Sequence, residues 1–147
     1  MKIKIEIDET LKETEVVIRT EKVTDKVNNI VKSISDEMIP NIIMGFREDN
    51  VEILDETKIL RIYSSSGKVF ADTEDGEYIL RLRLYQLEDR LSPSMFVRIS
   101  NSEIINLKKV RKFDLSFVGT ICVVFSNGVT TYVSRRYVSK IKKVLGI

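Results

Sequence analysis

The first twenty residues alternate between apolar and polar positions in two short runs. In KIKIEIDE the apolar residues are Ile3, Ile5 and Ile7, and TEVVIRT carries a second apolar run over residues 15 to 19. A period of two is typical of a half-buried strand, because successive side chains point to opposite faces. We therefore expect two short strands that pair as a hairpin.

Helical spacing follows the two predicted strands. The apolar residues between Thr20, a suitable N-cap, and Pro40, which stops the pattern, are Val23, Val27, Ile30, Val31 and Ile34. This spacing predicts one amphipathic helix over residues 21 to 38. Two strands and one helix bury little apolar surface. The module of residues 1 to 45 is therefore expected to pack on the rest of the chain, or on a second copy with this helix as the dimer element.

From residue 51 the pattern changes to short runs rich in β-branched and aromatic residues. They are VEIL, ILRIYSS, KVFADT, YILRLR, FVRIS, EIINL, VRKFDLSF, TICVVFS and VTTYVS. Glycine-containing turns, SSGK, EDGE and SNGV, separate several of them. Leucines at helical spacing in LRLYQLEDRLS and apolar residues in SRRYVSKIKKVL predict two helices. Residues 46 to 147 are thus expected to form a mainly β domain with short helices.

Charge is distributed unevenly along the 147 residues. Residues 1 to 93 contain 14 Lys and Arg against 20 Asp and Glu, a balance of −6, whereas residues 94 to 147 contain 10 against 2, a balance of +8. A cationic block inside folded sequence favours a polyanionic partner, most often nucleic acid. The alternative is a solvated basic face without a partner. The sequence contains no apolar run of membrane-helix length and no signal-peptide pattern, so we expect a cytoplasmic protein.

The residue inventory argues against an enzyme or a metalloprotein. The chain has no histidine and one cysteine, Cys122, which lies in an apolar run and is interpreted as a core residue. Nitrogen and sulfur metal sites cannot be built from this set. The carboxylate pairs in TEDGE and LEDR have ordinary roles in a turn and on a polar helix face. Each glycine stands alone, without a phosphate-binding loop. We expect no cofactor, no metal and no small-molecule substrate.

A polar cluster interrupts the apolar run MFVRISNSEIINLKKV. If FVRIS is a strand, Arg98 and Ser100 share one face, and Asn101 and Ser102 follow in a loop. Short hydroxyl and amide groups beside an arginine suit phosphate oxygens and base edges. The alternative is a turn in which these side chains satisfy nearby backbone groups. Asn106, between apolar neighbours, is interpreted as a buried side chain that braces a turn.

A second candidate stretch is VSRRYVSKIKKV. Arg135 and Arg136 stand where a strand passes into a helix, with Ser134 as a candidate cap. An arginine at such a junction can reach a major groove and donate a bidentate pair of hydrogen bonds to guanine. Lys140 and the two lysines that follow it are suited to phosphates or to solvent.

Three blocks of the chain occur in a familiar order. They are GKVFADTEDGEYILRLRLYQLEDRL, FVRISNSEIINLKKV and SNGVTTYVSRRYVSKIKKVL. Together they resemble the LytTR DNA-binding domain of bacterial transcription regulators over residues 46 to 147. The chain also looks like stand-alone members that lack a receiver domain, although residues 1 to 40 match that pattern more loosely.

The resemblance implies a small-sheet β fold that binds DNA through loops rather than a recognition helix. In this family, side chains from separate loops enter successive major grooves, and two copies occupy tandem sites. By motif position the contact residues are Arg98, Ser100, Asn101, Ser102, Arg135 and Arg136. Some relatives place a histidine where Gly67 stands, and Lys68 beside it would replace that contact only as a less selective charge. Lys140 completes the predicted interface.

One departure from the family pattern affects base preference. Many relatives have histidine and then arginine or lysine where this chain has Ser100 and Asn101. The contact there is therefore expected to be a neutral hydrogen bond. The resemblance implies a homodimeric regulator of promoter DNA, with control by expression level or by a neighbouring membrane protein. The alternatives are a β-rich module that binds protein or RNA through its basic third, and a small hydrolase for which no carboxylate pair is evident.

Overall fold

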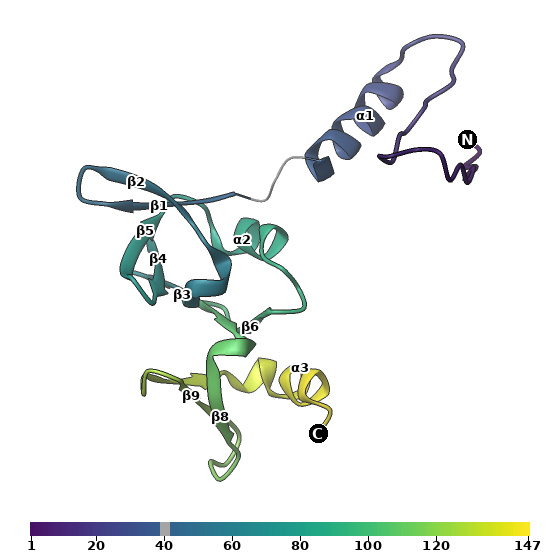
Figure 1. Ribbon diagram of the computed structural model, residues 1–147. Coiled ribbons are helices and arrows are strands. Elements are labelled where there is room, and N and C mark those ends of the chain that lie inside the picture. Colours follow the sequence, from purple (N-terminus) through teal and green to yellow (C-terminus); the bar gives the residue numbers. More distant parts are fainter. Residues whose placement is uncertain (39–41) are drawn as a thin grey trace. The chain divides into compact units, whose positions relative to one another are not determined.

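The computed structural model describes residues 1–38 and 42–147. The chain divides into two compact units, Met1–Pro40 and Asn41–Ile147 (Figure 1). The sequence places the boundary between residues 45 and 46, and these two residues lie within the first strand of the second unit, β1 (Ile43–Arg47). Residues 39–41, which include the Pro40 expected to stop the helical pattern, lie outside the described residues.

The helix predicted for the first unit is confirmed as α1 (Asp25–Met38). It begins later than expected because Thr24, and not Thr20, caps it. The amide of Val27 donates to Thr24 Oγ1 at 3.4 Å, and the amide of Asn28 donates to the Thr24 carbonyl at 3.0 Å. A threonine oxygen that accepts from the first helical amides is a common N-cap.

The hairpin predicted for residues 3 to 19 is wrong for this structure. The described residues before α1 contain no strand, only a turn in which the amides of Thr10 and Leu11 donate to Asp8 at 2.9 and 3.3 Å. Ile3, Ile5 and Ile7 remain 85 to 89% exposed. An isolated pair of short strands with no cover on its apolar face is at best marginally stable, which explains the absence of pairing.

The second unit contains two antiparallel sheets and two helices. The larger sheet has the strand order β2-β1-β5-β4-β3-β7-β6, and the smaller has the order β10-β9-β8. The remaining strands of the larger sheet are β2 (Asn50–Leu54), β3 (Ile59–Ser65), β4 (Lys68–Thr73), β5 (Gly76–Leu80), β6 (Phe96–Ser100) and β7 (Glu103–Asn106). Helix α2 (Leu84–Arg90) lies between β5 and β6, and short 3-10 turns occupy Glu56–Lys58 and Leu107–Lys109. The smaller sheet comprises β8 (Val110–Asp114), β9 (Ile121–Phe125) and β10 (Thr130–Val133), and α3 (Arg135–Leu145) follows it.

The mainly β fold with short helices is therefore confirmed for this unit, with one strand added. Strand β1 was not predicted, because its sequence, IMGFR, does not alternate regularly. It pairs along its whole length with the adjacent β2, and it joins the rest of the larger sheet where Phe46 pairs with Ile79 of β5. The β3–β4 turn agrees with its sequence. Ser66 and Gly67 have φ of 52° and 76°, as a two-residue hairpin turn requires.

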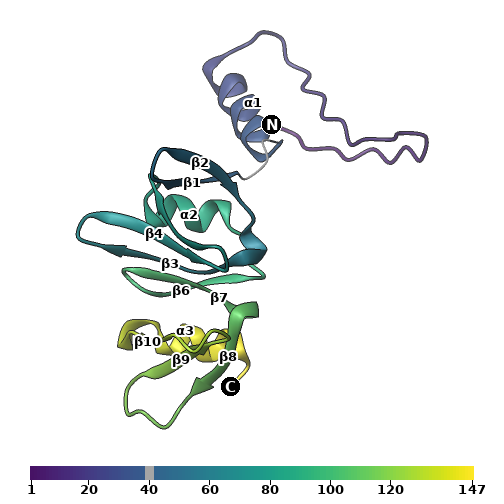
Figure 2. The same ribbon diagram turned by 60° about the vertical axis from the view of Figure 1, so that its left-hand side comes forward.

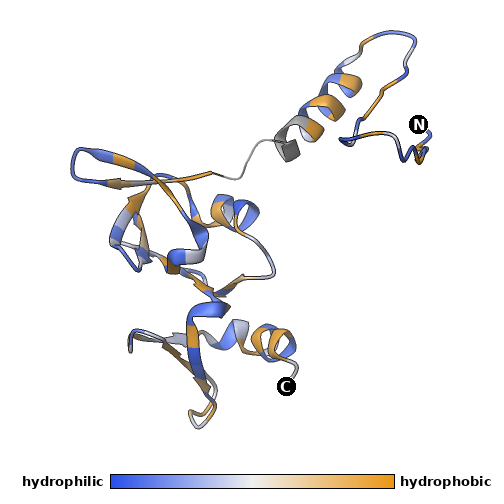
Figure 3. Cartoon of the chain, viewed as in Figure 1, coloured by the Kyte–Doolittle hydropathy of each residue, from blue (hydrophilic) through white to orange (hydrophobic). Residues whose placement is uncertain are grey.

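Two hydrophobic cores lie on opposite faces of β6 and β7. One core is closed by α2, where Leu84, Leu87 and the following Leu91 are buried as the leucine spacing predicts. The other is formed by residues of the smaller sheet and α3, among them Phe125 and Ile141. Figure 2 shows β6 and β7 between these two layers. Figure 3 shows the matching alternation of hydrophobic and hydrophilic positions along the strands.

Asn106 braces a turn from a buried position, as the sequence predicts. Its side chain is fully buried. Nδ2 donates to the carbonyl of Ile59 at 2.8 Å, and Oδ1 accepts from the amide of Lys108 at 2.9 Å. One side chain thus ties β7 to the start of β3 and caps the turn that leads into β8.

Candidate nucleic-acid interface

Two hairpin turns project from the same end of the larger sheet. The β3–β4 turn closes where Ser65 pairs with Lys68. The β6–β7 turn follows Ser100, and its Ser102 carbonyl accepts from the amide of Ser64 at 2.8 Å. This bond between neighbouring strands sets the two turns side by side, as Figure 2 shows. Lys68 and the polar cluster, which are far apart in the sequence, therefore share one edge of the fold.

The strand-to-helix junction lies beside the same turn. The amide of Ser134 donates to the carbonyl of Ile99 at 2.9 Å, which brings the end of β10 to β6. The hydroxyl of Tyr137 donates to Asn101 Oδ1 at 3.3 Å. Helix α3 begins at Arg135, as the sequence predicts, although Ser134 makes no side-chain capping bond. The structure thus brings the middle and terminal blocks together.

Arg98 has a different environment from the other candidates. Its side chain is only 15% exposed, and its nitrogens are directed at the protein itself. Nε donates to the carbonyl of Ser100 at 2.7 Å, a terminal nitrogen donates to the carbonyl of Asn101 at 2.5 Å, and the other pairs with Glu88 of α2 at 3.2 Å. In this structure Arg98 holds the β6–β7 turn in place.

The turn itself is organised by its two serines. The hydroxyls of Ser100 and Ser102 lie 3.3 Å apart, and the amide of Ser102 donates to Ser100 Oγ at 3.2 Å. Asn101 and Ser102 are exposed, while Ser100 is half-buried. Ser100 therefore satisfies a backbone group of its own turn, which is the alternative that the sequence left open. The side chain of Asn101 is exposed at the tip of the β6–β7 turn.

The remaining predicted cations are exposed around these turns. They are Lys68, Arg135, Arg136 and Lys140. The guanidinium of Arg135 lies against Gly119 of the β8–β9 loop, where a Cβ would stand 3.5 Å from Nε. The Lys140 ammonium lies 5.9 Å from the ring centre of Tyr137, the residue that contacts Asn101. Arg136 has no ion-pair partner among the described side chains, those of residues 1–34 and 42–147.

Two further arginines at this end were missed by sequence reasoning. Arg81 and Arg83 leave the sheet after β5, whose Leu80 pairs with Val69 beside the β3–β4 turn. Both are exposed, and Arg81 stacks over the ring of Phe46 at 4.0 Å. They lie within residues 1 to 93, where acidic residues outnumber basic ones, so the uneven distribution of charge did not point to them. The RLR spacing at the end of a strand was the available signal.

A buried carboxylate lies directly behind the β6–β7 turn. Glu103 Oε1 accepts from the hydroxyl of Thr131 at 2.8 Å, and Oε2 lies 3.7 Å from Arg61 without a hydrogen bond among the described residues. Burial raises the pKa of Glu103, and the bond from Thr131 and the charge of Arg61 oppose that rise. Glu103 therefore connects β7 to the smaller sheet at an electrostatic cost.

Glu103→Gln is expected to flatten the decline of stability with rising pH. A raised pKa means that the folded chain binds more protons than the unfolded chain between the ordinary and the raised pKa of Glu103. The free energy of unfolding therefore falls as pH rises through that interval. Gln keeps an acceptor for Thr131 but does not titrate. Urea unfolding of both proteins from pH 4 to 8 measures the difference, and parallel pH profiles would contradict this expectation.

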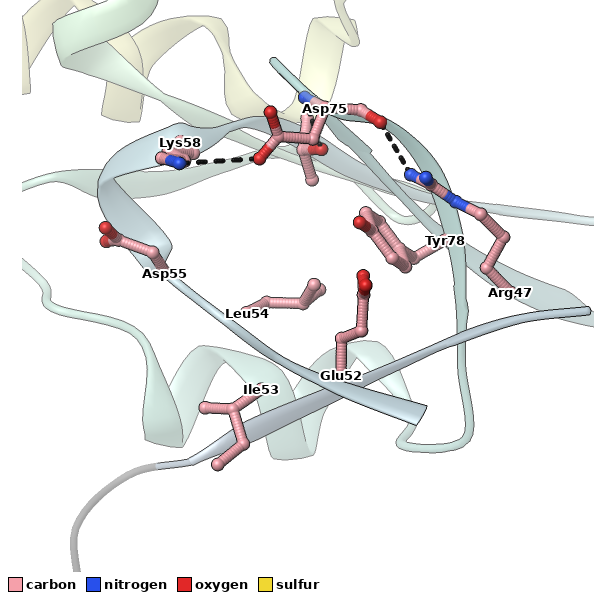
Figure 4. A pocket seen from close by; sticks show the side chains of 9 residues that line it. Arg47, Glu52, Ile53, Leu54, Asp55, Lys58, Asp75 and Tyr78 are labelled. Carbon is pink, nitrogen blue, oxygen red and sulfur yellow. Dashed lines mark hydrogen bonds and ion pairs between the residues drawn. The ribbon is translucent and has the colours of Figure 1, made fainter. Parts of the chain in front are cut away.

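A polar pocket of about 500 Å³ occupies the opposite end of the larger sheet, where Ile59 pairs with Thr73. Asp75 lies between two of its cations, Lys58 and Arg47, as Figure 4 shows. Lys58 lies 3.5 Å from the Asp75 carboxylate, and Arg47 donates to the Asp75 carbonyl at 2.7 Å while it stacks 3.9 Å from the ring centre of Tyr78. A hydrogen bond to Glu52 raises the pKa of Tyr78. These pairings stabilise the sheet end and are separate from the candidate interface.

The described residues contain neither a clustered metal site nor a membrane-length helix. No three His, Cys, Asp or Glu side chains gather around a common point in that part of the chain. None of its helices is both long and apolar enough to cross a bilayer. Cys122 is buried, as its apolar surroundings predict.

This chain is similar to several known proteins. The LytTR DNA-binding domain model matches residues 49–146. Uncharacterized HTH-type transcriptional regulators from Staphylococcus aureus strains COL and Mu50 are each 31% identical over 147 residues, which is 100% of this chain and 99% of each relative. The described part of this chain has no helix-turn-helix, because strands separate its three helices.

A solved structure has the same fold. It is the LytTR DNA-binding domain of a Bacillus cereus protein described as a methyl-accepting/DNA response regulator. It matches with a TM-score of 0.70 and 21% identity, and the match covers 72% of this chain and 97% of that chain. The family model spans most of the second unit, including the turns and the junction that form the candidate interface. The chain therefore belongs to the LytTR DNA-binding domain family.

Proposed function

We propose that this chain, a DNA-binding transcriptional regulator of the LytTR family, reads double-stranded promoter DNA in the cytoplasm. It does so through the end of the fold that carries the β3–β4 turn, the β6–β7 turn and the start of α3. The observation that carries this proposal is the pair of bonds from Ser134 to Ile99 and from Tyr137 to Asn101. These bonds place an exposed arginine at the start of α3 beside an exposed amide at the β6–β7 turn. Two such groups on a rigid scaffold can contact base edges in a groove.

Different residues of the interface have different roles in this proposal. Arg136 reads guanine, since its guanidinium is free to donate two parallel hydrogen bonds. Asn101 contributes a neutral hydrogen bond, because the nearby cation, Arg98, is occupied by backbone carbonyls and Glu88. Arg98 therefore acts as a positioning residue. Lys68, Arg135 and Lys140 supply charge to phosphates, with Ser100 and Ser102 shaping the turn.

The proposal is tested by selecting bound sequences from random duplex DNA and then measuring affinity as a function of salt. A specific reader is expected to enrich one motif and to lose affinity for all sequences as salt rises, because lysine and arginine contacts to phosphate release counterions. Enrichment of no motif would contradict specific readout. A motif with two half-sites would support binding by two copies.

We also propose that the protein acts as a homodimer on paired sites. The apolar side of α1 supports this, because Val31 on it is 46% exposed, and Val23 just before the helix is 71% exposed. Burial of such a stripe against a second copy would remove apolar surface from water. A neighbouring membrane protein is the proposed source of control.

A further inference from the structure

The N-terminal segment MKIKIEIDE combines an uncovered apolar row with an ordered row of charges. Three isoleucines occupy alternate positions and are 85 to 89% exposed. Figure 3 shows this alternation along the segment. Of the charged residues that alternate with the isoleucines, Lys2 and Lys4 precede Ile5, and Glu6 and Asp8 follow it. The segment therefore reverses its charge about its own centre.

Such a sequence is complementary to itself in the antiparallel direction. If Ile5 of one copy lies opposite Ile5 of another, Lys4 opposes Glu6, Lys2 opposes Asp8 and Ile3 opposes Ile7. Every cross-strand pair then joins opposite charges or two isoleucines, and both kinds of pair stabilise a sheet. We propose that residues 2–8 pair with the same segment of a second copy of the chain, as an antiparallel strand pair about a two-fold axis.

Other pairings of this segment are less well matched. A hairpin that continued the Asp8–Leu11 turn would set Glu6 opposite Glu13 and Ile7 opposite Lys12. Parallel pairing in register would set each lysine opposite a lysine. Like charges directly opposite one another destabilise a sheet. A two-fold interface of identical patches is also the commonest form of homodimer.

The two-stranded pair places all six isoleucines on one face, and this face needs cover. The stripe of α1 that contains Val27 and Ile30 belongs to the same unit and has the period for that role. The strand pair and the α1 helices that cover it can form only when two copies meet. This explains why the described single chain has no strand here. The inference gives the proposed homodimer its interface and rests on that part of the proposed function alone, since it requires no DNA.

Charge reversal tests the register without DNA. K2E/K4E makes the strand wholly acidic, and E6K/D8K makes it wholly basic. Each variant alone is expected to dimerise at least roughly tenfold more weakly than the natural protein in analytical ultracentrifugation. An equimolar mixture is expected to recover the natural affinity, because acidic and basic strands then oppose each other. K12E/K22E, with the same change in net charge outside the register, is expected to dimerise normally.

Cysteine cross-linking provides a second measurement in a C122A background. Ile5→Cys is expected to form a disulfide-linked dimer readily, whereas Ile3→Cys alone is not, because residue 3 opposes residue 7. A mixture of I3C and I7C is expected to link as readily as I5C. A monomer at all concentrations, unchanged dimerisation of both charge variants, or equal linking by I3C and I5C would overturn the inference. If the natural protein dimerises as expected but binds no DNA, the proposed function is contradicted and this inference is not.

Discussion

Arg136→Ala is expected to weaken binding to a specific DNA site by about 1 to 3 kcal/mol and to relax base choice at one position. Arg136 is exposed in the first turn of α3, next to the turn that carries Asn101. Its removal takes away a paired donor that lysine cannot reproduce, since an ammonium group lacks the planar fork of a guanidinium. Arg136→Lys is therefore expected to keep non-specific affinity and to lose most of the discrimination.

Lys142→Ala is the matched control on the same helix. Lys142 is exposed in the last turn of α3 and is suited to contact phosphate or solvent. This variant is expected to weaken specific and random DNA by similar small factors and to reduce the salt dependence slightly. Affinities of both variants for the selected site and for random duplexes measure the contrast. Equal losses for the two variants on both kinds of DNA would rule out base reading by Arg136.

The sequence predicted the elements of the second unit well, for local reasons. Strands such as β3 and β9 are rich in β-branched and aromatic residues, and the SSGK turn supplies the glycine that a two-residue hairpin requires. Strand β1 was missed because its sequence, IMGFR, does not alternate regularly, although it pairs with both β2 and β5. The N-terminal strands were predicted from alternation alone. Alternation does not supply the covering layer that a strand pair needs, and the structure shows no pairing.

The candidate site was predicted in outline, but the use of each side chain was not. Residue types and family resemblance selected the β6–β7 turn and the start of α3, and the structure brings these two together. The inward orientation of Arg98 depends on Glu88, whose position is set by the packing of α2 on the sheet. No local pattern encodes that contact. The sequence therefore placed Arg98 at the candidate site but did not predict its contact with Glu88.

Asn106→Ala is expected to lower the free energy of unfolding of the second unit by about 2 to 4 kcal/mol. The side chain is fully buried and makes two hydrogen bonds, one to the Ile59 carbonyl and one from the Lys108 amide. Its loss leaves a buried carbonyl without a donor, removes a cap and opens a small cavity, and these costs add. Asn106 ties β7 to β3 and caps the turn into β8, so the loss is expected to affect the unit as a whole.

Asn127→Ala separates this effect from the loss of an ordinary turn. Asn127 makes the same type of bond, because its Oδ1 accepts from the amide of Val129 at 3.0 Å, but it is exposed in the β9–β10 turn. Water can replace that bond, so the expected loss is below about 1 kcal/mol. Urea unfolding followed by far-UV circular dichroism measures both variants. Similar losses would mean that turn formation, and not the buried bond to Ile59, makes Asn106 important.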